Sequence, residues 1–180
     1  GTCGGICYGV PLYTTTLGMI YNAEIFERLG LCAPRTYEEF LRVCATLKAS
    51  GYDAIALGAA GDRHMKYWGN YLFCNYIASG DGQVCWTKEK AAEMLGDFRD
   101  LASRGYINSR YRAVTDRETA RAISTRQAVM VYAGPQMLQQ IENLNPQIRL
   151  GFFFLPGKNG TVYAMDDRSV QWGISSLTAR

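Results

Sequence analysis

Few side chains in this sequence could carry out covalent catalysis. The chain holds one histidine, His64, and a hydrolase would need a cysteine or serine nucleophile beside that imidazole. No G-x-S-x-G turn, phosphate-binding loop or metalloprotease motif is present to hold such a pair. We therefore expect a protein that is not an enzyme, with a Cys/His-dependent hydrolase as the catalytic alternative.

The cysteines lack the spacing of a zinc site. There are six of them, with no C-x-x-C pair, and only one imidazole could join them as a ligand. They are Cys3, Cys7, Cys32, Cys44, Cys74 and Cys85. We expect no metal ion and no cofactor, while the redox state and pairing of the thiols stay open.

The environment of four thiols can be predicted from their neighbours. Cys44 and Cys74 lie among apolar residues with helical periodicity, where a reduced thiol packs as a small hydrophobic group. Cys3 and Cys7 in one extended strand would lie about 13 Å apart on the same face. That distance is too long for a disulfide unless the glycines between them turn the chain.

Hydrogen bonding to a polar ligand is the second kind of chemistry that the sequence offers. The segment Tyr13–Thr16, with the sequence YTTT, separates the apolar runs Val10–Leu12 and Leu17–Tyr21. Threonine hydroxyls donate and accept hydrogen bonds, and a tyrosine ring has a flat apolar face with a polar tip. Threonines are also favoured in strands for their shape alone. The pattern therefore fits either a ligand contact or an ordinary strand.

Composition excludes several classes of partner. The chain has 180 residues, 48% of them hydrophobic, and a net charge of +3 without a basic run. These values predict one ordered globular unit that does not bind nucleic acid. Apolar stretches such as Phe152–Leu155 are far shorter than the roughly 20 residues that span a bilayer. The opening GTCGGICYGV has neither the basic start nor the apolar region of an export signal.

Helical patterns alternate with apolar stretches typical of buried strands. Two capping boxes, Thr36 with Glu39 and Thr115 with Glu118, mark helix starts. The expected helices are Asn22–Gly30, one from Thr36 to Gly51, Met65–Ser79, Thr87–Arg104, Thr115–Arg126 and one opened by Gly134 and Pro135. The expected strands are Val10–Leu12, Leu17–Tyr21, Asp53–Ala59, Ala128–Gly134, Ile148–Gly157 and Ser169–Ser176. This order predicts an α/β lobe with a mixed sheet flanked by helices.

Four stretches, in this order, resemble the extracellular solute-binding proteins of carbohydrate ABC transporters, the family that includes maltose-binding protein. They are YGVPLYTTTLGMIYNAEIFERLGL, PRTYEEFLRVCATLKASGYDAIALG, AISTRQAVMVYAGPQMLQQI, and RLGFFFLPG with WGISS. The resemblance runs over essentially the whole chain. It implies that residues 1–180 form a single lobe of a periplasmic-binding-protein-like fold, mostly the second lobe, with crossing strands near 8–16 and 168–176.

Members of that family have two α/β lobes and hold a sugar in the cleft between them. The resemblance implies that this chain is the central part of such a protein, about half of it. It also implies a role as the substrate-binding component of an importer that delivers a sugar to a membrane permease. The expected location is extracellular or periplasmic, with the parent anchored as a lipoprotein whose signal is not in this chain. Apolar surface left uncovered by the missing segments should favour self-association.

The resemblance places Tyr13–Thr16 at the hinge, and the loop after Asp53–Ala59 at the sheet edge where ligands bind. Many relatives carry an aromatic residue directly after the loop aspartate and a tryptophan after Gly-Pro, whereas this chain has Arg63 and Gln136 there. The predicted ligand-binding residues are Tyr13, Thr14, Asp62, His64, Trp68, Gln136, Asp167 and Trp172.

Each of these residues has a structural alternative. Trp68 shares a helical face with Leu72, which is typical of a core residue, and a lone histidine is commonly a satisfied structural residue. Trp172 could pack the hinge. For the whole chain, the alternative to sugar binding is a non-catalytic lobe with a structural or protein-interaction role. The sequence does not identify the sugar, because specificity depends on both walls of the cleft.

Overall fold

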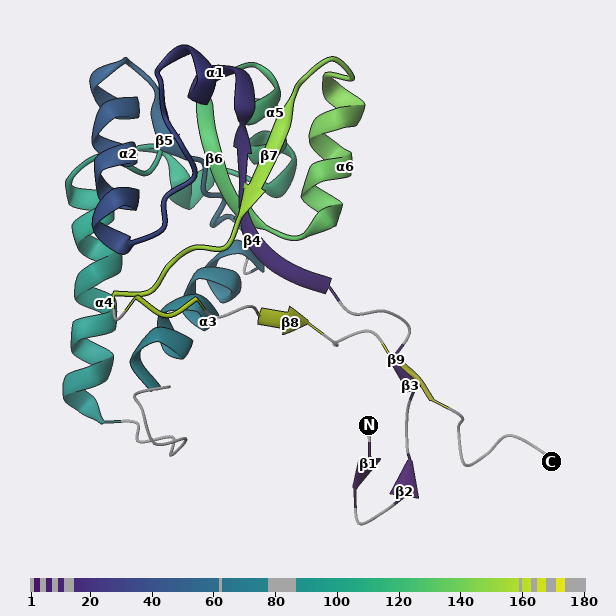
Figure 1. Ribbon diagram of the computed structural model, residues 1–180. Coiled ribbons are helices and arrows are strands. Elements are labelled where there is room, and N and C mark those ends of the chain that lie inside the picture. The colour runs from purple at the N-terminus through teal and green to yellow at the C-terminus, as the bar shows by residue number, and fades with distance from the viewer. Residues whose placement is uncertain are drawn as a thin grey trace.

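The structure is a computed structural model that describes residues 2–3, 6–7, 10–11, 15–61, 63–77, 87–158, 160–162, 165–167 and 171–173. A mixed sheet lies at its centre, with helices packed on both faces (Figure 1). This arrangement confirms the α/β fold class and the helix-flanked mixed sheet that the sequence predicts.

The central sheet has the strand order β5-β6-β4-β7, and β8 pairs with the first part of β4. Its strands are β4 (Thr15–Asn22), β5 (Asp53–Ile55), β6 (Ala128–Ala133), β7 (Leu150–Phe153) and β8 (Met165–Asp167). β5 and β6 run parallel, and β4 is antiparallel to β6, β7 and β8. The loops that follow β5 and β6 therefore lie at the edge of the sheet where β4 begins.

β4 is the strand around which both cores form. Its side chains alternate between the two faces, so that Met19 enters one core and Ile20 enters the other. The strand begins at Thr15, two residues before the predicted Leu17, because Thr15 and Thr16 pair with β8.

Six α-helices and one short 3-10 helix surround the sheet in the described part of the chain. They are α1 (Ala23–Arg28), α2 (Tyr37–Ala49), α3 (Arg63–Ile77), α4 (Lys88–Ser103), η1 (Tyr111–Ala113), α5 (Asp116–Ser124) and α6 (Pro135–Leu144). Helices α1 to α4 contribute to the larger core, where Phe40, Trp68 and Leu101 are buried with Met19. Helices α5 and α6 form the smaller core on the opposite face, around Ile20 (Figure 1).

The N-terminal caps of α2 and α5 follow the predicted pattern in different detail. At α5 the box is complete: the Thr115 amide donates to the Glu118 carboxylate at 2.8 Å, and the Glu118 amide donates to the Thr115 hydroxyl at 3.3 Å. At α2 the Glu39 amide donates to the Thr36 hydroxyl, but the Glu39 carboxylate accepts from the amide of Arg35. The reciprocal bond at α2 is thus shifted by one residue.

Two strand pairs lie outside the central sheet. β3 (Val10–Pro11) pairs antiparallel with β9 (Gln171–Trp172), which joins the two segments expected to cross between lobes. β1 (Thr2–Cys3) pairs antiparallel with β2 (Ile6–Cys7), and the register places Thr2 opposite Cys7. Cys3 and Cys7 therefore lie in two antiparallel strands and not in one extended strand, which is the second of the two arrangements that the sequence left open.

The described thiols fit the expectation of reduced, packed cysteines in part. Cys44 is free and fully buried, and Cys74 is free and half-buried, whereas Cys32 is free and exposed. Burial raises the pKa of the Cys44 and Cys74 thiols, so both stay protonated near neutral pH. Among the described residues, no group of three or more potential ligands could hold a metal ion.

Candidate functional site

The edge of the sheet where β4 begins is the place to look for a ligand site, because the loops after β5 and β6 meet there. Gly134 follows β6 and caps α6, with Pro135 in the first helical position. A methyl group on Gly134 would lie 2.7 Å from Thr15 Cγ2 and 3.1 Å from Gln136 Oε1. The absence of a side chain at this turn thus lets the start of β4 and the first turn of α6 approach closely.

A narrow crevice of about 10 Å³ lies at this edge between the first turns of α3, α5 and α6, which is room for one polar group of a ligand and not for a whole sugar ring. It is lined by Arg63, His64, Tyr67, Asp116, Ala133, Gly134, Gln136, Met137 and Gln140. Two of the predicted ligand residues, His64 and Gln136, therefore come together from segments far apart in the sequence. Their side chains differ in access, because His64 is 1% exposed while Gln136 is exposed.

The imidazole of His64 is held inside the lobe by two neighbours. Its Nδ1 accepts a hydrogen bond from the Gly58 amide at 3.3 Å and lies 3.7 Å from Asp116 Oδ1. Burial lowers the pKa of His64, the carboxylate of Asp116 opposes that shift, and the nearby Arg63 adds to it. The side chain is therefore neutral near pH 7.

Asp116 and Arg63 form the charged part of the crevice. Arg63 Nε lies 3.8 Å from Asp116 Oδ2, and the Asp116 side chain is 31% exposed. Sequence analysis missed Asp116 and Gln140, which also line the crevice. The signal for Asp116 was available, because it directly follows the cap residue Thr115 and so begins a helix.

Trp68 lies in the larger core and not in the crevice. It is 1% exposed and packs edge-on against Tyr71, with ring centroids 5.9 Å apart. Its ring is tilted relative to that of Tyr132, with centroids 5.5 Å apart. This placement matches the core alternative drawn from its spacing with Leu72. An indole buried in this way presents no face to a ligand, so we leave Trp68 out of the proposed site.

The remaining predicted residues are described in part or not at all. Tyr13, Thr14 and Asp62 lie outside the described residues. The backbone of Asp167 pairs with Thr15 in the β4–β8 ladder, and that of Trp172 pairs with Val10 in the β3–β9 ladder.

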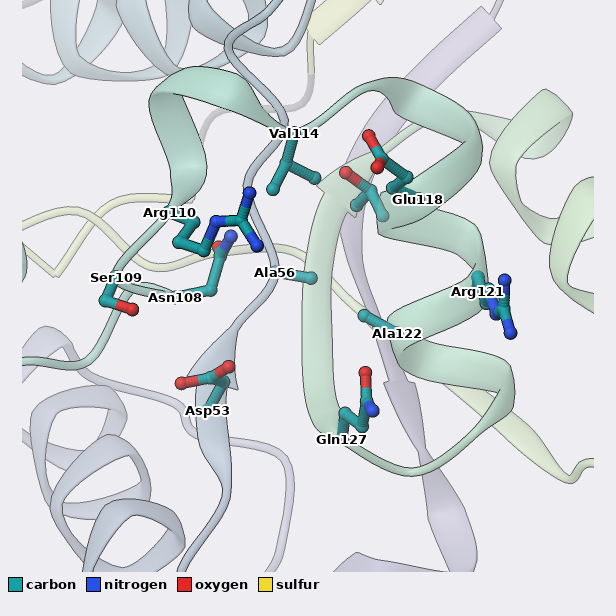
Figure 2. A pocket seen from close by; sticks show the side chains of 11 residues that line it. Asp53, Ala56, Asn108, Ser109, Arg110, Val114, Glu118, Arg121, Ala122 and Gln127 are labelled. Atoms are coloured by element: carbon teal, nitrogen blue, oxygen red, sulfur yellow. The ribbon is translucent and has the colours of Figure 1, made fainter.

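A second hollow, of about 330 Å³, lies beside β5 on the face covered by α5 (Figure 2). Asp53 and Gln127 lie at one end of it, Arg110 projects in from the loop before η1, and Ala56 and Ala122 form small walls. Burial raises the pKa of Asp53. Of the predicted ligand residues whose side chains the structure describes, His64, Trp68 and Gln136, none lines this hollow.

Comparison with known proteins decides the family. The model of the family described as bacterial extracellular solute-binding protein matches residues 1–176. The chain belongs to the bacterial extracellular solute-binding proteins. This result confirms the family that the four sequence stretches resemble.

Three relatives show how far the likeness of this solute-binding chain extends. The multiple sugar-binding protein of Streptococcus mutans is 26% identical over 162 residues, which cover 84% of this chain and 39% of that protein. A chitin oligosaccharide binding protein has a TM-score of 0.84 at 26% identity, over 99% of this chain and 47% of that one. RafE in complex with raffinose has a TM-score of 0.79 at 20% identity, and the match covers 95% of this chain and 48% of RafE.

The chain thus spans less than half the length of each of these relatives. The match to RafE shows the shared fold. In the part of the chain that the structure describes, no helix has the length and apolar character needed to cross a membrane.

Proposed function

We propose that this chain is one lobe of the substrate-binding component of an ABC importer. In the whole protein, a sugar or oligosaccharide would lie in the cleft between two lobes and pass to a membrane permease. The observation that carries this proposal is the polar crevice at the sheet edge, which brings His64, Asp116 and Gln136 together. Family membership supports the transport role, and relatives named for multiple sugars, raffinose and chitin oligosaccharide support a carbohydrate ligand.

The chemistry of the crevice suits a neutral carbohydrate. Sugar hydroxyls require both donors and acceptors, and these are offered by the Asp116 carboxylate, the Gln136 and Gln140 amides and the Arg63 guanidinium. Because Arg63 and Asp116 lie close together, their charges offset each other and the crevice has no strong preference for an ion. The predicted residues Tyr13, Thr14, Asp62, Asp167 and Trp172 would complete this wall.

The proposed domain organisation is a single lobe over residues 1–180 with crossing strands near 8–16 and 168–176. The antiparallel pairing of β3 with β9 supports two adjacent crossings. We place the parent outside the cytoplasmic membrane, anchored as a lipoprotein, and the family description supports an extracellular location.

We also propose that the protein has no catalytic turnover. The relatives described above are named as binding proteins. The Nδ1 atom of the only histidine is occupied by the Gly58 amide, and the buried thiol of Cys44 has a raised pKa. Any hydrolysis of a glycoside, ester or sugar phosphate that disappears in His64→Ala would overturn this proposal.

Titration calorimetry on the full-length parent tests the binding role. Raffinose and a chitin oligosaccharide are the first ligands to titrate, followed by a panel of neutral sugars. Tyr13→Ala and Trp172→Ala should weaken binding by about 1 kcal/mol or more, since each removes a stacking ring. Gln136→Ala and Asp116→Ala should weaken it by about 1–3 kcal/mol, since each removes a hydrogen-bonding partner.

Gln139→Ala is the matched control, because Gln139 is an exposed residue of α6 that does not line the crevice. It should retain parental affinity. The isolated lobe should bind much more weakly than the parent, because it offers one wall and cannot close. Parental affinity in all four variants would show that the ligand binds elsewhere, and a parent that binds no neutral sugar would favour a structural or protein-interaction role.

A further inference from the structure

His64 occupies a junction between two elements that build the crevice. It lies in the first turn of α3, directly after the loop that leaves β5, and it is 1% exposed. Its Nδ1 has two neighbours that make opposite demands. The Gly58 amide, at 3.3 Å, needs an acceptor, whereas the Asp116 carboxylate, at 3.7 Å, needs a donor.

In the neutral imidazole, one ring nitrogen accepts and the other carries the proton. Acceptance from Gly58 therefore requires that Nδ1 be unprotonated and that the proton reside on Nε2. In the protonated imidazolium both nitrogens are donors, so Nδ1 can no longer accept from Gly58. Asp116 Oδ1, which lies 3.7 Å from Nδ1, can then accept its proton in a hydrogen bond.

We infer that His64 is a positioning residue for the loop that follows β5, here called the Gly58 loop. When neutral, its Nδ1 holds this loop; when protonated, its Nδ1 turns to Asp116, so that acid lowers the affinity of the crevice for its ligand. The exchange of partners follows from geometry alone. Its effect on sugar affinity rests on the proposed function. The ligand itself is neutral, so its own charge cannot cause a pH dependence in this range.

The Gly58 loop is held firmly on its other sides. Asn108 binds both the amide and the carbonyl of Leu57, at 2.7 and 3.2 Å, and the amides of Ala59 and Ala60 donate to backbone carbonyls of the 111–114 segment. His64 supplies the bond on the crevice side. Loss of that bond releases the loop at the point that leads to Asp62, a predicted ligand residue.

The same change alters Asp116, which begins α5 and faces the crevice. When neutral, His64 leaves that carboxylate beside Arg63 and open to ligand. When protonated, His64 draws on the same carboxylate and competes with a sugar hydroxyl for it. Among the described residues that line the crevice with His64, the charged or titratable groups are Arg63 and Tyr67 from its own helix and Asp116 from α5. Helix α6 contributes the uncharged Gln136 and Gln140.

The direction of the pH effect follows from burial. Burial lowers the pKa of His64 below its ordinary value of 6.5, so the neutral form prevails at neutral pH and protonation requires a pH below 6.5. Since the unfolded chain takes up the proton at higher pH than the folded one, folding stability also falls as pH drops below 6.5.

Hydrogen exchange of the Gly58 amide, followed by NMR in the 180-residue chain, tests the switch without any ligand. Protection relative to an unstructured amide should be high near neutral pH and fall about tenfold as His64 protonates. His64→Asn should keep protection across the same range, because the asparagine oxygen can accept from Gly58 and does not titrate. His64→Ala should lack this protection at every pH.

Asp116→Asn supplies an independent readout. Removal of the carboxylate should lower the pKa of His64 further, which NMR titration of the imidazole measures directly. Unchanged Gly58 protection in His64→Ala, or pH-dependent protection in His64→Asn, would overturn the switch.

Calorimetry with raffinose on the full-length parent tests the consequence for binding, with one titration at neutral pH and one at the pH where the NMR titration shows His64 protonated. Affinity should fall in acid for the parent and stay level in His64→Asn. If the Gly58 amide loses protection in acid but the affinity of the parent for sugar does not change with pH, the link to affinity is overturned and the proposed function stays intact. A parent that binds none of the neutral sugars would refute the proposed function while the exchange result still decides the switch.

Discussion

Replacement of Gly58 by alanine tests whether the loop after β5 is as tightly fitted as the structure shows. A methyl group at Gly58 would lie 2.6 Å from the Thr119 hydroxyl and 3.0 Å from the carbonyl oxygens of Thr115 and Val114. Two of these three neighbours are backbone atoms. The methyl group therefore cannot be accommodated by rotation of a side chain, and the loop must move away from α5.

The expected cost can be worked from this crowding. Insertion of a methyl group into a packed site typically costs about 1–3 kcal/mol. The lower entropy of an unfolded chain with alanine returns about 0.4–1 kcal/mol. Gly58→Ala should therefore lower the free energy of unfolding by about 1–2 kcal/mol, which for a chain of this size is a fall of about 2–8 °C in Tm.

Chemical denaturation of the 180-residue chain measures this change. Gly61→Ala is the matched control, because it lies in the same loop with no atom within 4 Å of the added methyl group. Its stability should be unchanged or slightly higher. In Gly58→Ala/Thr119→Ala, removal of the hydroxyl that is 2.6 Å away should recover part of the loss, which a double-mutant cycle detects. Equal stability of Gly58→Ala and Gly61→Ala would refute the fitted loop.

Three further predictions concern stability and association. Thr115→Ala removes the cap of α5 and should lower the free energy of unfolding by about 1 kcal/mol, and more than Thr125→Ala, whose hydroxyl only donates to Arg121 O on an exposed turn. Burial raises the pKa of Asp53 above its ordinary value of 3.8, so the charged carboxylate opposes folding near pH 7. Asp53→Asn should therefore raise the free energy of unfolding measured in urea at pH 7, and this gain should shrink as the pH falls toward 3.8. Phe152 and Phe154 are 44% and 39% exposed and pack edge-on with ring centroids 5.2 Å apart, which leaves an exposed apolar patch. Light scattering should therefore show a mass that rises with concentration and rises less in Phe152→Ser/Phe154→Ser; a strictly monomeric chain would contradict this.

Local signals in the sequence were sufficient for most of the fold. The two threonine caps and the Gly-Pro turn each act within a few residues, and all three start helices in the structure. Boundaries that depend on distant partners differ from expectation. β5 ends at Ile55 and not at Ala59, because the Leu57 amide bonds to the Asn108 side chain and not to a strand.

The candidate site was predictable only where residue type and chain position agree. Gln136 follows the Gly-Pro turn, and its place at the sheet edge follows from that turn alone. Asp116 was missed because the cap motif at Thr115 marks only the start of a helix, whereas the approach of that helix start to the crevice depends on how α5 packs against the sheet. Trp68 is the reverse case, because it was predicted to bind ligand from its residue type but lies in the core. Its helical spacing with Leu72 had already indicated this core position.

The central claim is that a sugar binds at the sheet edge beside His64, Asp116 and Gln136. Hydrogen-deuterium exchange on the full-length parent, with and without a sugar found to bind by calorimetry, tests it most directly. The account predicts ligand-induced protection of segments 58–67 and 133–140, which form the crevice. Protection confined to segments 106–114 and 121–127, around the hollow shown in Figure 2, would contradict it.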